Sequence, residues 1–278
     1  MSVIVFTLIV LVGSYFAGLL GSLTGLGGGV VIIPLLTLLL HVDIHYAIGA
    51  ALISVIATSS GSAAAYVKEG ITNIRIGMFL EIATTAGAFT GAILAIYVSV
   101  KFIAVLFGTI LIFSAIMSLR EKKEHITGAK SFLSRRLRLD SSYPVEGEMV
   151  EYGVTNIAGG FFMMLFAGII SGLLGIGSGA LKVLAMDGIM RIPFKVSTTT
   201  SNFMIGVTAA ASAVVYLQRG YVHPVIAMPV VVGVLFGAVS GSKILVHTKS
   251  SGWLRWVFAI VVTVLAVQVI YNGLADKL

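Results

Sequence analysis

The stretch Gly25-Leu26-Gly27-Gly28-Gly29 returns 150 residues later as Gly175-Ile176-Gly177-Ser178-Gly179. Each copy lies between an apolar run and a second, shorter apolar segment. Glycine has no Cβ, so these stretches can turn tightly and expose their backbone N–H groups. In a bilayer, an unwound backbone is tolerated only where it is buried in protein or lines a wet cavity. The repeated break therefore predicts two copies of one membrane unit, the arrangement with which secondary transporters bind substrate near the bilayer midplane.

Composition agrees with a membrane protein. Of the 278 residues, 58% are hydrophobic and 10% are charged, and the mean hydropathy is +1.07. Continuous apolar runs predict an all-α polytopic membrane protein rather than a β-barrel, whose strands alternate. We distinguish ten segments: 3–22, 28–40, 44–67, 75–98, 101–119, 154–174, 178–190, 195–218, 222–246 and 253–273. Segments 28–40 and 178–190 are near or below crossing length, so they are half-helices, tilted spans or re-entrant pieces.

Several classes of function are disfavoured. The net charge of +7 comes from basic residues in short loops, which set membrane topology and do not indicate nucleic-acid binding. The chain has no cysteine, so thiol chemistry and thiolate metal sites are excluded. No complete phosphate-binding loop is present, and no cofactor is expected. His41, Asp43 and His45 share a short loop without further ligands, so we expect a solvated loop rather than a metal site.

The chain divides into a first transmembrane repeat (1–119), a polar connector (120–152) and a second repeat (153–278). A constant shift of 150 also aligns Tyr66 with Tyr216, Gly70 with Gly220, Met78 with Met228, Gly87 with Gly237 and Gly91 with Gly241. If all five segments of each half cross, the odd number forces the halves into opposite orientations, an inverted repeat. If the short segments are re-entrant, each half has four crossings and this assignment weakens.

Loop charge predicts the orientation. The connector carries seven of the 18 basic residues, the largest group in the chain, and cytoplasmic loops are enriched in Lys and Arg. With the connector inside, most of the other basic loop residues also fall on the cytoplasmic side, so we expect a multi-pass protein of the cell membrane with a cytoplasmic connector and an external N-terminus. A short amphipathic helix is expected near Phe132–Leu139 of the connector.

The two glycine breaks are the first candidate site. Exposed N–H groups followed by a helix N-terminus attract an anion. The alternative is close helix packing, in which small residues let two backbones touch. The repetition at matching positions favours a binding site. The glycine series Gly233, Gly237 and Gly241, matched by Gly87 and Gly91, is instead expected to form packing faces, within one chain or between subunits of a homo-oligomer.

Leu23-Thr24-Gly25-Leu26-Gly27-Gly28-Gly29, then Pro34 and Ile48-Gly49-Ala50-Ala51-Leu52, resembles the TauE/SafE family of sulfite exporters. The second half repeats the pattern with Gly175–Gly179 and Ser197-Thr198-Thr199-Thr200-Ser201-Asn202. The resemblance covers nearly the whole chain and implies a secondary permease for sulfur-containing anions such as sulfite or organosulfonates. Ser178 replaces Gly28 and Leu184 replaces Pro34, so the two halves of the site are not expected to be equivalent.

Polar residues inside the apolar segments are further candidates. The run Ser197–Asn202 would be costly at membrane depth unless it faces a cavity, although single hydroxyls can bond back to their own helix. Lys182 either places a positive charge beside the substrate or extends toward the interface. Glu81 either carries a coupling proton or pairs with Arg75, and the pair is slightly preferred.

Together these residues predict a secondary transporter that binds a small sulfur-containing anion near the midplane and alternates access between the two sides. The predicted binding residues are Thr24, Gly25, Gly27, Gly28, Gly29, Gly175, Gly177, Ser178, Gly179, Lys182, Thr199, Thr200, Ser201 and Asn202. Two alternatives stay open. One is an anion channel, which would use the same site without alternating access. The other, much weaker, is an intramembrane hydrolase with Ser178 as nucleophile and His223 or His247 as base.

Overall fold

Long apolar helices make up most of the protein. The computed structural model describes residues 3–24, 27–119, 132–145, 148–247 and 252–275. The long helices are α1 (Val3–Thr24), α3 (Ile44–Lys68), α4 (Ile74–Ala95), α5 (Val100–Leu119), α7 (Ile157–Leu174), α9 (Phe194–Gln218), α10 (Pro224–His247) and α11 (Gly252–Leu274). Six of these, all but α5 and α11, are long and apolar enough over the described residues to cross a membrane. The predicted helical, polytopic class is confirmed.

Each glycine break is followed by a short helix. In the first half α2 (Gly29–Pro34) continues into the π-helix η1 (Leu35–Leu39), and in the second α8 (Gly179–Val183) continues into η2 (Leu184–Ile189). At about 1.5 Å per residue, each continuous segment is about 16 Å long, roughly half the hydrocarbon core of a bilayer. These segments are therefore half-helices and do not cross by themselves.

The short segments double back along the helices that precede them. A Cβ built on Gly13 of α1 would lie 2.5 Å from Leu35 Cδ2, and one on Gly21 would lie 2.6 Å from the carbonyl carbon of Gly27. In the second half, the Thr155 N–H just before α7 donates to the Met190 carbonyl just after η2, at 3.1 Å. Each pair is thus a hairpin that returns the chain to the end of the bundle from which it started.

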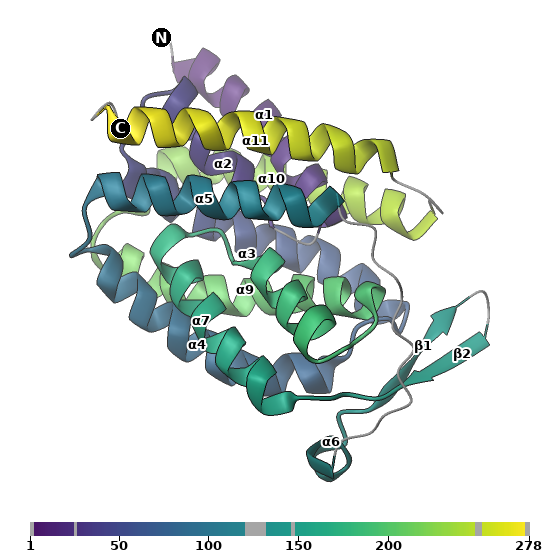
Figure 1. Ribbon diagram of the computed structural model, residues 1–278. Coiled ribbons are helices and arrows are strands. Elements are labelled where there is room, and N and C mark those ends of the chain that lie inside the picture. The colour runs from purple at the N-terminus through teal and green to yellow at the C-terminus, as the bar shows by residue number, and fades with distance from the viewer. Residues whose placement is uncertain (1–2, 25–26, 120–131, 146–147, 248–251, 276–278) are drawn as a thin grey trace.

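The two halves pack reciprocally. Helix α1 packs along α10, and its counterpart α7 packs along α4. Helices α3 and α9, whose bounds differ by the same shift of 150, lie against each other at the centre, and α5 lies beside α11 (Figure 1). This arrangement is the one expected of a duplicated unit.

Glycines let the reciprocal pairs approach closely. A Cβ built on Gly91 of α4 would lie 2.0 Å from the Ile169 carbonyl oxygen of α7, and one on Gly237 of α10 would lie 2.0 Å from that of Tyr15 in α1. No side chain fits at such distances, so glycine is required at both positions. The predicted packing faces are confirmed within one chain.

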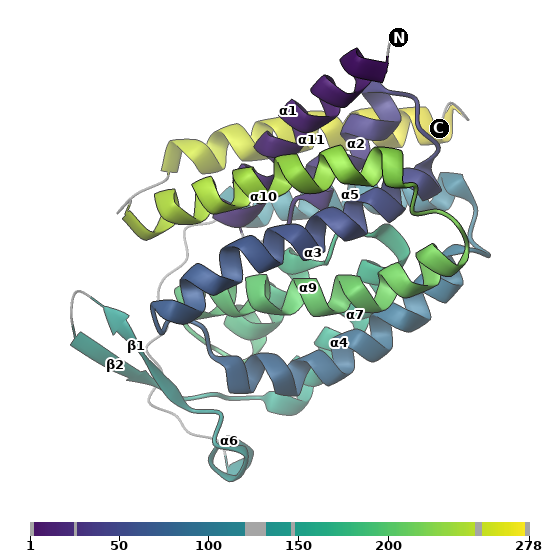
Figure 2. The same cartoon turned by 180° about the vertical axis from the view of Figure 1, so that it is seen from behind.

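The connector contains the part of the fold that the sequence analysis did not anticipate. The expected helix is present as α6 (Phe132–Leu137), but a hairpin of β1 (Ser141–Val145) and β2 (Glu148–Tyr152) follows it. The prediction of a purely helical chain is therefore corrected for this segment. The hairpin and α6 project from one end of the bundle, whereas both chain ends lie toward the other end (Figures 1 and 2).

The β-hairpin is joined to the helices through Asn73. Its Nδ2 donates to the Tyr152 hydroxyl at 2.8 Å and to the Leu139 carbonyl at 3.1 Å. Its Oδ1 accepts from Ile76 N at 3.1 Å and caps α4. Burial raises the pKa of the Tyr152 phenol to about 12, so this hydroxyl stays protonated at physiological pH.

The outer surface of the bundle is apolar. Large exposed side chains recur at helical spacing on several of the long helices: Ile4, Leu8, Val12, Phe16, Met78, Ile82, Phe89, Phe162, Phe166, Met228, Phe236, Ile260, Val264 and Val267. Side chains of this kind suit contact with lipid tails. The bilayer is thus the environment to which this surface is matched.

The close approach of α4 and α7 predicts the effect of adding a side chain there. Gly91→Leu should destabilise the folded protein by about 3 kcal/mol, because the new side chain meets the backbone of α7. Thermal unfolding of the detergent-solubilised protein measures the change. Ala86→Leu, at an exposed position of the same helix, is the matched control and should leave the unfolding temperature unchanged. Equal stability of both variants would contradict the close packing.

Candidate functional site

The two glycine breaks touch each other. A Cβ built on Gly29 would lie 3.0 Å from the Gly175 carbonyl oxygen and 3.4 Å from Ile176 Cα. The described residues of both breaks, 27–29 and 175–179, are buried. Segments separated by 150 residues in the sequence are therefore in contact, as the sequence analysis expected.

The breaks meet at the middle of the two central helices. A Cβ on Gly27 would contact Val55 Cγ2 and Ile205 Cδ1, each at 3.3 Å, and one on Gly177 would contact the same two side chains at 3.0 and 3.3 Å. Val55 and Ile205 are each the twelfth residue of a 25-residue helix. If α3 and α9 cross the bilayer, the breaks lie near its midplane.

Left-handed backbone makes the breaks possible. Gly27 has φ +81° and Gly177 has φ +72°, values that glycine adopts without the steric penalty of a Cβ. Ser178, with φ +46°, is the non-glycine exception in the second break. Gly175 N–H donates to the Ser171 carbonyl at 2.8 Å and ends α7, and Lys182 N–H donates to the Ser178 carbonyl at 3.1 Å and begins α8.

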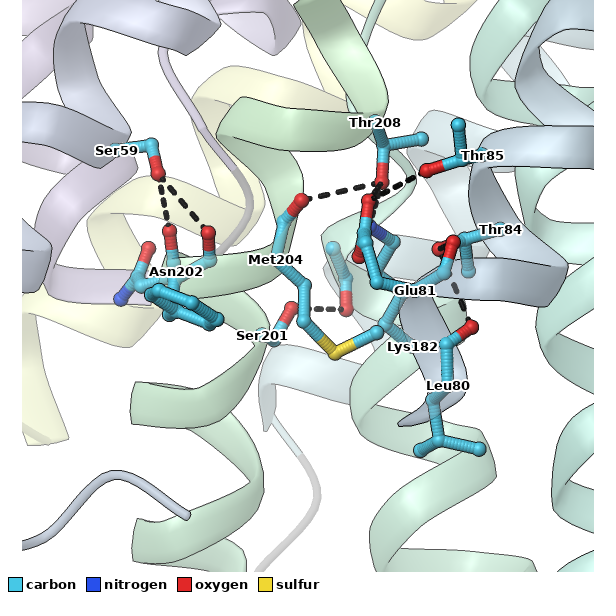
Figure 3. Close-up of polar contacts among 12 residues, drawn as sticks. Ser59, Leu80, Glu81, Thr84, Thr85, Lys182, Ser201, Asn202, Met204 and Thr208 are labelled. Atoms are coloured by element: carbon cyan, nitrogen blue, oxygen red, sulfur yellow. Dashed lines mark hydrogen bonds and ion pairs between the residues drawn. The ribbon is translucent and has the colours of Figure 1, made fainter. Parts of the chain in front are cut away.

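Ser178 of the second break and Asn202 of α9 both have polar side-chain atoms without a partner among the described residues. Ser178 Oγ and both amide atoms of Asn202 are buried without a hydrogen bond among the described residues. Ser201, next to Asn202, donates from Oγ to the Gly179 carbonyl at 3.3 Å, which attaches α9 to this break. Ser59 Oγ of α3 donates to the Asn202 carbonyl at 2.6 Å (Figure 3). Buried polar groups are normally paired, so these are candidates for contact with water or a ligand.

The other predicted site residues lie elsewhere or are not described. Thr199 Oγ1 bonds back to its own helix at the Lys195 and Val196 carbonyls. Thr200 Oγ1 accepts from Asn73 N at 3.1 Å, near the connector. Gly25 and the side chain of Thr24 lie outside the described residues.

A buried ion pair lies next to the second break. Lys182 Nζ is 3.7 Å from Glu81 Oε2, and the two side chains are 0% and 10% exposed. Thr208 lies between them: its hydroxyl accepts from Lys182 Nζ and donates to Glu81 Oε1 at 2.6 Å. Thr85 Oγ1 donates to the same Glu81 oxygen at 3.3 Å (Figure 3). The cluster joins α4, α8 and α9.

The ion pair corrects two sequence interpretations. Glu81 does not pair with Arg75, whose Nη1 instead donates to the Arg138 carbonyl at 3.4 Å. Lys182 does not extend toward the interface, because it is fully buried. The shift of 150 contains a signal that the sequence analysis missed, since Lys182 corresponds to Ile32 and Glu81 to Val231. The pair thus joins one residue from each half, and the symmetry-related pair of positions is apolar.

A stripe of hydroxyls on α9 was also missed. Thr208, Ser212 and Tyr216 follow one another every fourth residue, a spacing that places them on one face of the helix. All three are buried, and the Tyr216 hydroxyl has no hydrogen-bond partner among the described residues. Ser212 Oγ donates weakly to the Ala88 carbonyl of α4 at 3.4 Å. Polar groups thus continue from the ion pair along the seam between α4 and α9.

The breaks do not line the open cavity at the far end of the bundle. That cavity, of about 310 Å³, is lined by Phe6, Val42, Tyr46, His223, Val225 and Ile226. His223 is therefore far from the unpartnered Ser178 hydroxyl, which does not support a Ser–His pair. The side chain of His247, the other candidate base, lies outside the described residues. His45 Nδ1 is 3.2 Å from Asp43 Oδ1, and the described residues contain no group of three side chains suited to a metal.

Apolar helices, duplicated half-helices and a buried polar site between them define a polytopic membrane protein of the transporter type. The model of the family described as sulfite exporter TauE/SafE matches residues 10–269. This chain therefore belongs to the TauE/SafE family, and the resemblance seen in its sequence is confirmed.

Curated relatives carry matching names. The probable membrane transporter protein YunE of Bacillus subtilis (strain 168) is 30% identical over 279 residues, covering 97% of this chain and 98% of the relative. YdhB of the same organism, also named a probable membrane transporter protein, is 26% identical over 85% of this chain and 89% of its own length. MJ0441 of Methanocaldococcus jannaschii, named likewise, is 23% identical over 85% of each chain. No solved structure matches. These names indicate a membrane transporter rather than an enzyme.

The ion pair predicts that removing one charged partner destabilises the protein more than removing both. Lys182→Met and Glu81→Gln each leave one buried partner alone, and Lys182→Met, which strands the carboxylate, should destabilise the protein by about 3 to 5 kcal/mol. The double variant should recover most of that loss, because no uncompensated charge remains. Thermal unfolding of the three purified variants tests this. Additive losses in the double variant would contradict a direct pair.

Proposed function

We propose that the protein is a secondary transporter for a small sulfur-containing oxyanion, such as sulfite or an organosulfonate, that binds between the two glycine breaks. The observation that supports this most strongly is the meeting of the breaks at the middle of α3 and α9, next to the unpartnered Ser178 hydroxyl and Asn202 amide. Substrate sites of repeat transporters are formed by such discontinuous helices.

The chemistry of the breaks suits an anion. Both half-helices begin at the site, so the positive ends of their backbone dipoles point toward it. A hydroxyl and an amide N–H₂ group add donors that can replace part of an oxyanion's hydration shell. The name of the family is the support for sulfur in that oxyanion.

The two access routes follow from an inverted arrangement of the repeats. Each hairpin returns to its starting end, so the three long helices that follow it leave each half with an odd number of net crossings. The sides predicted from loop charge are therefore the same as for five crossings, with a cytoplasmic connector and an external N-terminus. Both breaks are buried in this conformation, which corresponds to an occluded state from which rocking of one bundle opens either side.

Substitution of the unpartnered groups tests the site. Asn202→Leu introduces the residue found at the matching position of the first half, Leu52, and removes an amide without leaving a new polar group. It should weaken anion binding by about tenfold or more, the equivalent of at least one lost hydrogen bond of about 1.4 kcal/mol. Ser178→Ala should weaken binding in the same direction and leave part of the flux.

The measurement is anion-dependent thermal stabilisation against sulfite, sulfate, thiosulfate, organosulfonates and carboxylates, because a bound ligand stabilises the folded state. Thr109→Ala, at an exposed position of α5, is the control and should bind like the unmodified protein. Unchanged binding in both site variants would show that the anion does not bind between the breaks.

Counterflow separates a carrier from a channel. Proteoliposomes loaded with unlabelled anion should accumulate labelled anion transiently against its gradient, because a carrier exchanges one molecule for another across the membrane. A channel with the same site equilibrates the label and shows no such accumulation. Equilibration of the label without accumulation would indicate a channel rather than a transporter, and it would not contradict the proposed binding site.

A further inference from the structure

The ammonium of Lys182 is loosely held. It donates one hydrogen bond, to Thr208, and lies 3.7 Å from Glu81 Oε2, which is beyond hydrogen-bond distance. An ammonium group has three donors. Within the described part of the chain, Glu81 Oε2 accepts no hydrogen bond, whereas Oε1 accepts from Thr208 and Thr85. The two charges thus balance each other inside the protein, but neither the ammonium nor the carboxylate makes all the hydrogen bonds of which it is capable.

The pair is also attached to the proposed substrate site. Lys182 lies in the first turn of α8, three residues after Gly179 of the second break. Ser201, which donates to the Gly179 carbonyl, is one residue from Asn202 and seven residues before Thr208 on α9. The second break, the unpartnered amide, Lys182 and Thr208 are therefore all carried by α8 and α9, and Glu81 joins them from α4.

We infer that Glu81 and Lys182 couple anion binding to proton binding, so that the anion replaces Glu81 as the partner of Lys182 only when the Glu81 carboxylate has taken up a proton. This inference rests on the proposed function and names its coupling ion. The proton comes from solvent on the side to which the site is open and forms a neutral carboxylic acid. Lys182 keeps its proton and its charge, and no covalent bond other than the O–H bond forms.

Charge balance is the reason for the coupling. With Glu81 ionised, a monovalent anion beside Lys182 would leave one uncompensated negative charge in the buried cluster, and such a charge is strongly unfavourable. With Glu81 protonated, the ammonium and the anion balance each other. The cluster is therefore neutral both before and after one proton and one monovalent anion have bound.

Among the residues that the structure describes, no other ionisable group is placed to take this role within the cluster. Helix α7, which packs along α4, has no ionisable side chain. Helix α9 carries Lys195 at its start and Tyr216 two turns beyond Thr208. On α4 itself Arg75 lies at the connector end, and beyond α8 Asp187 lies in η2. Because the symmetry-related positions are occupied by the apolar residues Ile32 and Val231, a single pair predicts one proton per anion.

The pH dependence of binding tests the inference. Thermal stabilisation by methanesulfonate, a monovalent anion whose charge is constant over the pH range used, gives the apparent affinity of the full-length protein in detergent. Because the bound state holds one more proton than the free state, the affinity should fall as the pH rises, by up to about tenfold for each pH unit. Addition of the anion to weakly buffered protein should also remove about one proton per anion bound, measured with a pH-sensitive dye.

Variants assign the proton to Glu81. Glu81→Gln imitates the protonated acid, so it should bind the anion at every pH with the affinity that the unmodified protein has at low pH, and it should take up no proton. The double variant Glu81→Gln, Lys182→Met has no buried charge and should fold but bind at least tenfold more weakly than Glu81→Gln. Glu69→Gln, at an exposed position beyond the end of α3, is the matched control and should keep the full pH dependence.

Three results would overturn the inference. Anion binding without pH dependence or proton uptake, in the unmodified protein, would leave the proposed function intact and remove the coupling. Normal pH dependence in Glu81→Gln would show that a group other than Glu81 takes up the proton. Absence of binding by any anion of the panel, in both the unmodified protein and Glu81→Gln, would remove the proposed function and this inference together.

Discussion

An interrupted helix inside a bilayer must bury its turn against protein, because lipid supplies no partner for exposed backbone groups. In this chain the two interruptions bury each other, with the Cβ position of Gly29 3.0 Å from the Gly175 carbonyl oxygen. Val55 and Ile205, from the middle of α3 and α9, cover both turns. The hairpins of α1 with α2 and of α7 with α8 have their turns inside the bundle, where this contact buries them. The glycine faces that join α1 to α10 and α4 to α7 then hold the hairpins against the remaining helices.

The backbone of the two halves is duplicated, but the chemistry is not. Lys182, Glu81 and Asn202 of the cluster correspond to Ile32, Val231 and Leu52. The unpartnered amide and the ion pair therefore have no counterparts at the symmetry-related positions of a nearly symmetric backbone. A symmetric frame lets two conformations be exchanged at similar free energy, and an asymmetric charge cluster gives the substrate and the proton one place to bind. In the proposed mechanism these are separate contributions to transport.

Much of this could be predicted from the sequence, since the shift of 150 and the two glycine stretches identify the repeat, the breaks and their contact. The partner of Glu81 could not be predicted from the sequence. Arg75 is close in sequence, but six residues along a helix place it on a different face of α4. Lys182 reaches Glu81 only through the tertiary packing of α8 and α9 against α4. Apolar composition likewise does not distinguish a half-helix that doubles back from a tilted span, and the polar residues of the β-hairpin carry no periodicity that separates them from a loop.

The contact between the breaks is the claim that a single measurement tests most directly. The chain has no cysteine, so the pair Gly29→Cys and Ile176→Cys can be introduced and oxidised in membranes without competing thiols. The Cβ position of Gly29 lies 3.4 Å from Ile176 Cα, which is within the geometry of a disulfide. Mass spectrometry should find the peptides containing positions 29 and 176 joined, and the pair Gly70→Cys and Gly220→Cys, at open positions, should give no such product. An absence of the 29–176 cross-link in folded protein would contradict the account.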